Sequence, residues 1–291
     1  MDLQAVEAFV AIVDHESFSH AAESLHLTQP AISKRLATLE KQLGHPLIER
    51  GARQLRLTDA GHRLLPHARR ILDDVHNAKQ DIAHLNEDIG GALTLIISHH
   101  IGLHHLPRWL QRFRTQYPSV QLQMRFMESE MAFEHLEKRE AELAFATLND
   151  RIVEQFQVHH AWEDPMKFVV APEHPLASQK SLSLAVLSQH EAILPAATTE
   201  TYRVVSHLFL TEGINLQAQM PTNYLETIKV MCAAGLGWSV LPENMLDDSL
   251  IVLDLPHRLV RLLGAVGLAR RQPFNAAKAF LEVVRDIETG L

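Results

Sequence analysis

Residues 17–43 read SFSHAAESLHLTQPAISKRLATLEKQL, and this stretch decides the fold of the first part of the chain. Ser17 is placed to cap a short helix. Thr28 is placed to cap a second helix, with Pro30 in its first turn, where a missing N–H costs little, and Gly44 at its end. Two short helices joined by a tight turn, the second of them capped and basic, predict a helix-turn-helix.

The outward face of the second helix is polar, whereas its other face carries an apolar stripe. The polar face holds Gln29, Ser33, Lys34 and Arg35. Residues at the N-terminus of such a recognition helix contact base edges in the major groove. Two short extended pieces follow and flank residues 50–53, so we expect a hairpin wing whose arginines contact phosphate or enter the minor groove.

The distribution of charge supports a nucleic-acid partner, although the net charge of −8 taken alone argues against one. Residues 28–70 carry nine Lys and Arg and three acids, whereas residues 1–27 carry five acids and neither Lys nor Arg. The positive charge is therefore local to the predicted helix-turn-helix and the segment after it. A solvated surface of mixed sign would have the same composition, so charge alone leaves that alternative open.

A long helix is predicted from about residue 58 to about residue 88. Its apolar residues recur at alternating intervals of four and three, namely Leu64, Ala68, Ile71, Val75, Ala78, Ile82, Leu85 and Ile89. This heptad spacing favours packing against a second helix, and we expect a dimer seam. Such a helix spans roughly 45 Å. The alternative is that it packs on the C-terminal domain of its own chain.

The pattern changes at Gly90-Gly91, which we interpret as a hinge. Beyond it, short apolar runs alternate with helical periodicity, which predicts an α/β fold with largely parallel sheets. Strands are expected over residues 93–98, 120–126, 142–147, 156–162, 166–171, 192–194, 216–219, 238–241, 251–253 and 262–268. Helices are expected over residues 104–117, 129–139, 201–212, 223–234 and 274–287.

Length and composition set the broad class. The chain of 291 residues suits two domains, and 46% hydrophobic with 21% charged residues is enough for a sizeable core. The single cysteine, Cys232, excludes an internal disulfide, and its apolar surroundings in sequence predict a buried, inert thiol. No secretory signal or stretch of about 18 apolar residues is visible, so we expect a soluble, cytoplasmic protein.

Four motifs in about the first 62 residues have a specific order and spacing: AAESLHLTQPAIS, LEKQLG, PLIER and LTDAG. Together they closely resemble the winged helix-turn-helix of the LysR-type transcriptional regulators. Three later segments, LPRWLQRFRTQYPSVQLQM, APEHPLA and AAGLGWSVLP, resemble the effector domain of the same family. The resemblance therefore covers nearly the whole chain, more loosely after residue 90.

The resemblance implies an α/β protein in three parts: a winged helix-turn-helix over residues 1–62, a linker and dimerisation helix over 58–89, and an effector-binding domain over 90–291. The effector domain would have two subdomains, like those of type 2 periplasmic solute-binding proteins, joined by two crossovers. The first subdomain would comprise residues 91–161 and 269–291, and the second residues 162–268. We expect a homodimer or homotetramer that needs no cofactor.

The resemblance also implies a function, that of a sequence-specific transcriptional regulator and not an enzyme. Two winged domains would bind the half-sites of an interrupted inverted repeat in promoter DNA, with RNA polymerase as a partner during activation. A small effector, with an anion as one option, would bind in the cleft between the subdomains. Its binding would favour one arrangement of the domains and so change the bend in the DNA.

The residues expected to contact DNA are Gln29, Pro30, Ser33, Lys34, Arg35, Arg50 and Arg53. Their chemistry is suitable, because Gln pairs with adenine, Arg and Lys favour guanine, and Ser donates to bases or phosphates. The effector contacts implied by the resemblance are Ser98, His99, His100, Ser129, Thr147, Ala197, Thr198 and Thr199. Ser98 fits the family habit of Ser or Thr at the end of this strand, and the two histidines depart from it.

Histidine is abundant, with 19 residues, and His99, His100, His104 and His105 fall within one short stretch. Imidazoles bind zinc, copper or nickel, so a metal sensor is one hypothesis. The spacing matches no ligand motif, however, and the first two side chains are expected on opposite sides of a strand-to-helix turn. We therefore assign no metal site, expect one of these histidines to line the cleft, and favour a proton-sensitive anion site.

Two other functional classes fit the sequence less well. No Gly-x-Ser-x-Gly, P-loop or dinucleotide-binding glycine motif is visible, which argues against an enzyme. A solute-binding protein would share the effector fold, but the helix-turn-helix argues against it. Binding to duplex DNA with a steep dependence on salt would separate a regulator from both classes.

Overall fold

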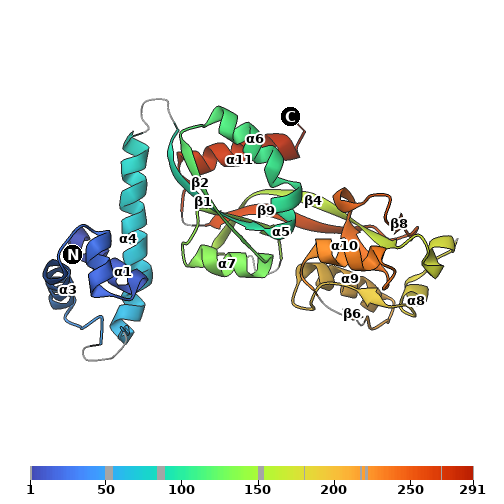
Figure 1. The fold of residues 1–291 in the computed structure, drawn as a ribbon, viewed down its shortest axis with the longest axis horizontal. Coiled ribbons are helices and arrows are strands. Elements are labelled where there is room, and N and C mark those ends of the chain that lie inside the picture. Colours follow the sequence, from blue (N-terminus) through green and yellow to red (C-terminus); the bar gives the residue numbers. More distant parts are fainter. Residues whose placement is uncertain are drawn as a thin grey trace. The chain divides into compact units, whose positions relative to one another are not determined.

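The computed structural model describes residues 2–49, 55–83, 89–149, 154–179, 181–216, 218–219, 222–269 and 271–290. The chain divides into two compact units, residues 1–87 and 88–291 (Figure 1). The division lies just before Gly90-Gly91, where the sequence predicts a hinge.

Within its described residues, the first unit consists of α1 (Leu3–His15), α2 (Phe18–Ser24), α3 (Gln29–Leu43) and α4 (Asp59–Ala83). Phe9 and Ile12 of α1 meet Ile32 and Leu39 of α3 in a core where all four side chains are fully buried. The amphipathic pattern of the helices therefore produces one shared core, as expected for a helix-turn-helix.

The helix ends follow the predicted capping residues, with one difference. The Ser17 and Thr58 hydroxyls accept backbone N–H groups at the starts of α2 and α4, at 3.3 Å and 3.1 Å. Gly44 ends α3 with φ of 75°, a left-handed conformation that favours glycine. Thr28 occupies the predicted N-cap position of α3, but its side chain makes no capping hydrogen bond.

The base of the predicted wing is present as a short antiparallel contact. Ile48 and Leu57 form a β-bridge, and the backbone N–H of Glu49 donates to the carbonyl of Arg56 at 2.9 Å. The expected tip, residues 50–53, lies outside the described residues.

The turn into α4 is tightly packed around Leu47. The Glu40 carboxylate of α3 accepts the backbone N–H of Leu47 at 2.7 Å, which fixes the chain after the recognition helix. Gly61 of α4 lies against the same residue, and a Cβ atom at Gly61 would overlap the Leu47 carbonyl oxygen. Glycine is therefore required at this position, which gives a physical reason for the glycine of the LTDAG motif.

The predicted heptad stripe of α4 divides into two parts. Ala68 is fully buried in the core of the first unit, whereas the Ile82 side chain is 69% exposed. Leu85 lies outside the described residues. Ile89, predicted as the last seam residue, instead packs against the core of the second unit. Among the described residues of the stripe in the first unit, Ala78 and Ile82 are therefore left exposed.

The second unit is built on a mixed sheet with strand order β2-β1-β3-β9-β4-β7, in which β8 adds to β4. Its strands are β1 (Gly91–Ser98), β2 (Val120–Met127), β3 (Leu143–Thr147), β4 (Phe156–Val170), β7 (Ser239–Pro242), β8 (Ile251–Val252) and β9 (Leu259–Leu268). A separate parallel pair joins β5 (Ala192–Ile193) and β6 (Ala218–Gln219).

The prediction of largely parallel sheets is wrong. Strand β1 runs parallel to β2 and β3, but β9 is antiparallel to β3 and to β4, and β7 and β8 are antiparallel to β4. The two long strands β4 and β9 cause the difference, because each continues through the whole unit and they pair with each other over most of their length.

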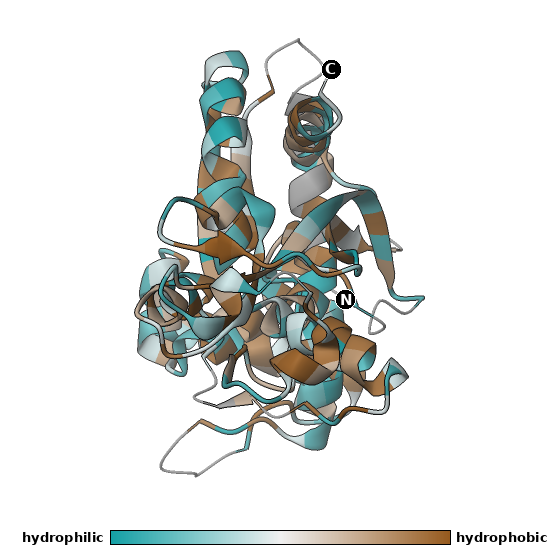
Figure 2. Cartoon of the chain, turned by 90° about the vertical axis from the view of Figure 1, so that its right-hand side faces the viewer, coloured by the Kyte–Doolittle hydropathy of each residue, from teal (hydrophilic) through white to brown (hydrophobic). Residues whose placement is uncertain are grey.

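The helices of this unit are α5 (His99–His104), α6 (Leu106–Gln116), α7 (Ser129–Glu137), α8 (Leu184–Leu187), α9 (Glu200–Thr211), α10 (Leu225–Ala233) and α11 (Asn275–Glu288), with short 3-10 turns at Pro175–Ser178 and Glu243–Met245. Helices α6 and α11 cover one face of β1 and α7 covers the other (Figure 1). Hydrophilic and hydrophobic bands alternate along the helices in Figure 2, as expected for helices with one buried face.

Two lobes share the long strands. We call the part around β1, β2, β3, α5, α6, α7 and α11 the first lobe, and the part around β5, β6, β7, α8, α9 and α10 the second lobe. Trp162 of β4 and Leu263 of β9 pack in the core of the first lobe, whereas Met166 and Leu259 pack in the core of the second. The chain therefore passes from one lobe to the other within β4 and within β9. The first passage lies after the predicted boundary between residues 161 and 162, and the second lies before the predicted boundary between residues 268 and 269.

Candidate functional site

Four of the predicted DNA contacts lie together on the exposed side of α3: Gln29, Pro30, Ser33 and Lys34. Ile32 lies on the opposite side of the helix and is fully buried in the core. Residues four apart are neighbours on a helix surface, so Gln29 adjoins Ser33 and Pro30 adjoins Lys34. The result is a polar, positively charged patch on a helix that its buried face holds rigidly.

Arg35 is arranged differently from its neighbour Lys34. It is partly buried, and its Nη2 donates to the side-chain oxygen of Gln4 on α1 at 2.9 Å. In this arrangement Arg35 joins α3 to α1 rather than projecting with the exposed patch. Arg50 and Arg53 lie outside the described residues, so their contacts stay predictions.

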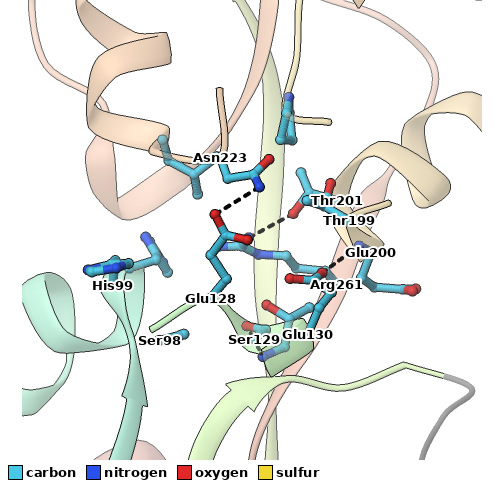
Figure 3. A pocket seen from close by; sticks show the side chains of 14 residues that line it. Ser98, His99, Glu128, Ser129, Glu130, Thr199, Glu200, Thr201, Asn223 and Arg261 are labelled. Carbon is cyan, nitrogen blue, oxygen red and sulfur yellow. Dashed lines mark hydrogen bonds between the residues drawn. The ribbon is translucent and has the colours of Figure 1, made fainter. Parts of the chain in front are cut away.

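A cavity of about 60 Å³ lies between the two lobes of the second unit (Figure 3). It is lined by Ser98, His99, His100, Glu128, Ser129, Glu130, Thr147, Pro195, Thr199, Glu200, Thr201, Asn223, Leu225 and Arg261. Six of the eight predicted effector contacts are therefore brought together. The other two, Ala197 and Thr198, are exposed and do not line the cavity.

The fold explains why these residues meet. Strands β1 and β3 are parallel neighbours, so their carboxyl ends, Ser98 and Thr147, lie at one edge of the sheet. The Ser129 hydroxyl, at the start of α7, accepts the backbone N–H of Thr147 at 3.0 Å. Thr199 caps α9 on the other side, and its hydroxyl accepts the N–H of Tyr202 at 3.2 Å. Strand ends and helix starts therefore form the walls of the cavity.

Two glutamates of the first lobe bind the second lobe across this space. Glu128 accepts a hydrogen bond from the Asn223 amide at 2.9 Å, and Glu130 accepts one from the backbone N–H of Glu200 at 3.3 Å (Figure 3). The His99 ring lies 5.1 Å, centroid to centroid, from the ring of Tyr224. These contacts hold the lobes close together, which accounts for the small volume of the cavity.

Arg261 is the only arginine or lysine of the cavity wall within the described residues. Its Nε donates to the Asp164 carboxylate at 2.7 Å and its Nη1 to the Thr201 hydroxyl at 2.9 Å. Arg261 is 5% exposed and Asp164 3% exposed, so the ion pair is out of water. Among the described residues, Nη2 of Arg261 has no hydrogen-bond partner. The guanidinium therefore keeps a donor that a ligand could use.

Arg261, Thr201 and Asn223 were absent from the predicted effector contacts. Arg261 follows Leu259-Val260 and precedes Leu262-Leu263, and a lone charge inside an apolar strand is a signal of a paired buried group. Because Asp164 lies far away in sequence, its pairing with Arg261 depends on the register of β4 with β9, in which the two are direct partners.

The charge of the cavity wall is mixed. Glu128, Glu130 and Glu200 contribute carboxylates, and Glu200 also accepts hydrogen bonds from Arg203 at 2.8 Å and 2.9 Å. Arg261 is opposite in sign but is already paired with Asp164. A simple anion would therefore meet negative charge on several sides. An anionic group of the effector is expected only in the space next to Arg261.

The histidine stretch differs from its prediction because α5 begins at His99, five residues before the expected helix start. His99 and His100, which are both among the expected effector contacts, both line the cavity, so the alternative in which only one histidine of this stretch lines it is wrong. His100 and His104 lie one turn apart on α5, with ring centroids separated by 4.9 Å. His105 lies beside them, and its Nδ1 is 3.2 Å from the Glu288 carboxylate.

His100 stays neutral in this environment. Burial, with further contributions from the charge of Arg261 and from the neighbouring histidines, lowers the pKa of its imidazole far below the usual value. The predicted proton-sensitive anion site, with a histidine charged near neutral pH, is therefore wrong for His100. Cys232 is fully buried as predicted, and burial raises the pKa of its thiol to about 12.

Known families match both units of the chain. The family described as "Bacterial regulatory helix-turn-helix protein, lysR family" matches residues 3–62, and the one described as "LysR substrate binding domain" matches residues 86–287. The chain belongs to the LysR-type transcriptional regulators. It therefore has the DNA-binding helix-turn-helix and the effector-binding domain of that family, as the sequence resemblance predicts, and the family is one of regulators rather than enzymes.

Relatives of this LysR-type regulator carry similar names. The HTH-type transcriptional regulator CfxR of Cupriavidus necator is 34% identical over 92% of this chain and 82% of its own. The HTH-type transcriptional activator CmpR of a Synechocystis strain is 30% identical over 87% of this chain and 84% of its own. An uncharacterized regulator from the ibpB-leuC intergenic region of Azotobacter vinelandii is 53% identical over 37% of this chain and 74% of its own.

Solved structures show the same fold. A full-length OxyR variant from Pseudomonas aeruginosa aligns with a TM-score of 0.74 at 20% identity, over 98% of this chain and 95% of that one. Full-length CbnR in complex with its target DNA aligns with a TM-score of 0.65 at 23% identity, over 98% and 99%. Within the described residues of this LysR-type regulator, no helix combines the length and apolar character needed to cross a membrane.

Proposed function

We propose that this regulator binds an interrupted inverted repeat in promoter DNA through Gln29, Ser33 and Lys34, with Pro30 shaping the first turn of the helix. The observation that carries the proposal is the exposed polar patch at the start of α3, fixed by the buried side of the same helix. The wing residues Arg50 and Arg53 belong to the proposal as contacts to phosphate or the minor groove.

The chemistry of the patch suits base readout. Gln29 matches adenine, Lys34 matches guanine, and Ser33 donates to a base or a phosphate. Each well-formed base contact contributes about 1–3 kcal/mol of discrimination. Since promoter DNA is the target, we place the protein in the cytoplasm and include RNA polymerase among its partners at promoters that it activates.

The test combines Ser33→Ala and Lys34→Ala in the full chain and measures binding to a promoter duplex by fluorescence anisotropy over a range of salt concentrations. We expect specific binding to fall at least tenfold, since two contacts are lost. Lys278→Ala, an exposed lysine of α11, removes the same charge outside the helix-turn-helix and is expected to leave binding unchanged. Equal affinities for the two variants would contradict the assigned contacts.

We further propose that the chain forms dimers through α4, with tetramers built from them. The heptad residues Val75, Ala78 and Ile82 continue the apolar stripe beyond the part that packs in the first unit. Ile82 is 69% exposed in a single chain, and apolar residues at this spacing are expected to pack against a second helix. Two winged domains would then reach both half-sites of the repeat.

The effector is proposed to bind in the cavity between the lobes. Nη2 of Arg261 and the hydroxyls of Ser98 and Thr201 suit a carboxylate or another anionic group, while Glu128 and Glu130 suit an ammonium or another donor. We therefore propose an effector with groups of both kinds. Because the cavity holds about 60 Å³, the lobes must separate to admit anything larger than a few atoms.

The effector proposal is tested by thermal shift of the full chain with a panel of amino acids, dicarboxylates and polyamines. Ser98→Ala is expected to abolish the shift caused by the best compound while leaving DNA binding intact. Ser178→Ala, an exposed serine of the second lobe, is the matched control. An unchanged shift in the Ser98→Ala variant would place the effector elsewhere.

A further inference from the structure

The environment of His100 leaves both of its ring nitrogens without a hydrogen-bond partner among the described residues. The side chain is only 7% exposed, so water does not replace the missing partners at the surface. An Asp164 carboxylate oxygen lies 3.6 Å from Nε2, too far for a good hydrogen bond. Buried polar atoms are normally satisfied, and a bound ion is one of the explanations for an unsatisfied one.

Two further side chains that bind metals lie next to His100. His104 follows it by one helical turn on α5, and its Nε2 is 3.0 Å from the carboxylate of Glu226 on α10. One ligand atom from each of the three residues lies within 4.8 Å of the others. Three residues separate His100 from His104, and the sequence, with these residues placed before or at the start of a helix, indicated no ligand motif in this spacing. Because α5 includes both residues, they share one helix face, and a His-x₃-His pair on a helix is a spacing found among zinc ligands.

A competing set of ligands shares His100 but suits a cation less well. His105 and Asp164 also place one atom each within 4.8 Å of His100. However, Asp164 already binds the Arg261 guanidinium at 2.7 Å, and that positive charge opposes a second cation. Glu226 is 38% exposed in its side chain and His104 26%, so the first set also has a path for a metal to enter.

We propose that His100, His104 and Glu226 form a binding site for a divalent transition metal of the zinc type. Two imidazoles and one carboxylate are the donors that zinc accepts with three protein ligands and a fourth, open position. Calcium and magnesium prefer oxygen ligands, of which this set supplies only one carboxylate. Zinc–ligand bonds of about 2.0–2.1 Å place tetrahedral ligands about 3.3 Å apart, so modest side-chain rotation closes the site.

The site joins the two lobes. Ile101 anchors α5 in the core of the first lobe, and Ile228 anchors α10 in the core of the second. A metal bound by His100, His104 and Glu226 therefore ties one lobe to the other at the edge of the effector cavity, which His100 also lines. Metal binding then favours the arrangement in which the lobes are close together, independently of which organic effector the cavity accepts.

The test uses the full chain after treatment with a chelator. Zinc is titrated by calorimetry, and cobalt is added separately because its visible absorption reports tetrahedral coordination by nitrogen and oxygen. We expect one tight site per chain, a rise in the melting temperature with zinc, and an intense cobalt spectrum. His104→Gln and Glu226→Gln are each expected to weaken binding at least tenfold and to remove the spectrum and the zinc-dependent stabilisation.

Three comparisons make the outcome decisive. Glu226→Gln keeps a neutral hydrogen-bonding group on a partly exposed residue, so its metal-free melting temperature is expected to match that of the unaltered protein. His207→Gln, an exposed histidine of α9, is expected to bind zinc normally. Weak binding that is equal in all variants would show surface histidines only and overturn the proposal, and loss of the site in His105→Gln but not in His104→Gln would overturn this choice of ligands.

Discussion

Replacing Arg261 by methionine is expected to destabilise the second unit by about 3–5 kcal/mol, because it leaves the buried Asp164 carboxylate without its partner. The two groups meet at 2.7 Å, and each is about 95% or more out of water. For a unit of about two hundred residues, each kcal/mol lowers the melting temperature by about 2–4 °C. The expected decrease is therefore about 6–20 °C.

The assay follows tryptophan fluorescence during thermal unfolding. The chain has three tryptophans, Trp109, Trp162 and Trp238, and all lie in the second unit, so the signal does not report on the DNA-binding unit. The matched control is Arg258→Met. Arg258 forms an ion pair with Glu163 in which the two side chains are 76% and 57% exposed, and exposed pairs contribute only about 0–1 kcal/mol.

Removal of both charges tests the same ion pair in a second way. A double variant that replaces Arg261 by methionine and Asp164 by leucine removes both charges, so most of the lost stability is expected to return. If Arg261→Met lowers the melting temperature no more than Arg258→Met does, the buried ion pair does not stabilise the fold. A double variant less stable than Arg261→Met alone would refute the account of the unpaired carboxylate.

The Cys232 thiol, buried and with its pKa raised to about 12, is expected to stay protonated at pH 8 and to react with an alkylating reagent only after unfolding, as mass spectrometry would show. Ile82→Asp is expected to dissociate dimers in analytical ultracentrifugation while Lys79→Ala on the same helix does not; dimers that survive would exclude Ile82 from the interface. Gly61→Ala is expected to lower the free energy of unfolding by about 1–3 kcal/mol, because the added Cβ atom overlaps the backbone of Leu47. Denaturant unfolding followed by far-ultraviolet circular dichroism measures this change.

The DNA-binding unit was largely predictable from sequence because its signals are local. Ser17, Gly44 and Thr58 mark helix ends through contacts within a few residues, and the apolar stripe of α3 decides which side of that helix faces outward. Arg35 was the exception, since the distance and direction of Gln4 on α1 depend on how two helices pack. Local capping rules contain no information about such a contact.

The second unit was harder to predict because its decisive contacts are distant in sequence. The segment Glu163-Asp164-Pro165 suggested a break between two strands, yet β4 continues through it and pairs Pro165 with Val260 of β9. The same register places Asp164 opposite Arg261, so the buried ion pair and the strand continuity have one cause. Six cavity residues were still predictable from the family resemblance, because strand ends and helix starts occupy fixed positions in that fold.

The contacts between the lobes determine how much free energy a ligand needs to separate them. Glu128 binds Asn223, Glu130 binds the backbone of Glu200, and Glu226 binds His104, so three of the contacts between the lobes each use one carboxylate. Three partly exposed hydrogen bonds stabilise the close arrangement by about 2–4 kcal/mol in total. A ligand needs a differential affinity of about 5.5 kcal/mol to invert a 1:99 equilibrium. A ligand that competes for two of these carboxylates removes only about two thirds of this stabilisation, so the rest of the required difference has to come from contacts that the ligand makes in the separated arrangement alone. A metal bound by Glu226 acts in the opposite direction, because it adds to the stability of the close arrangement.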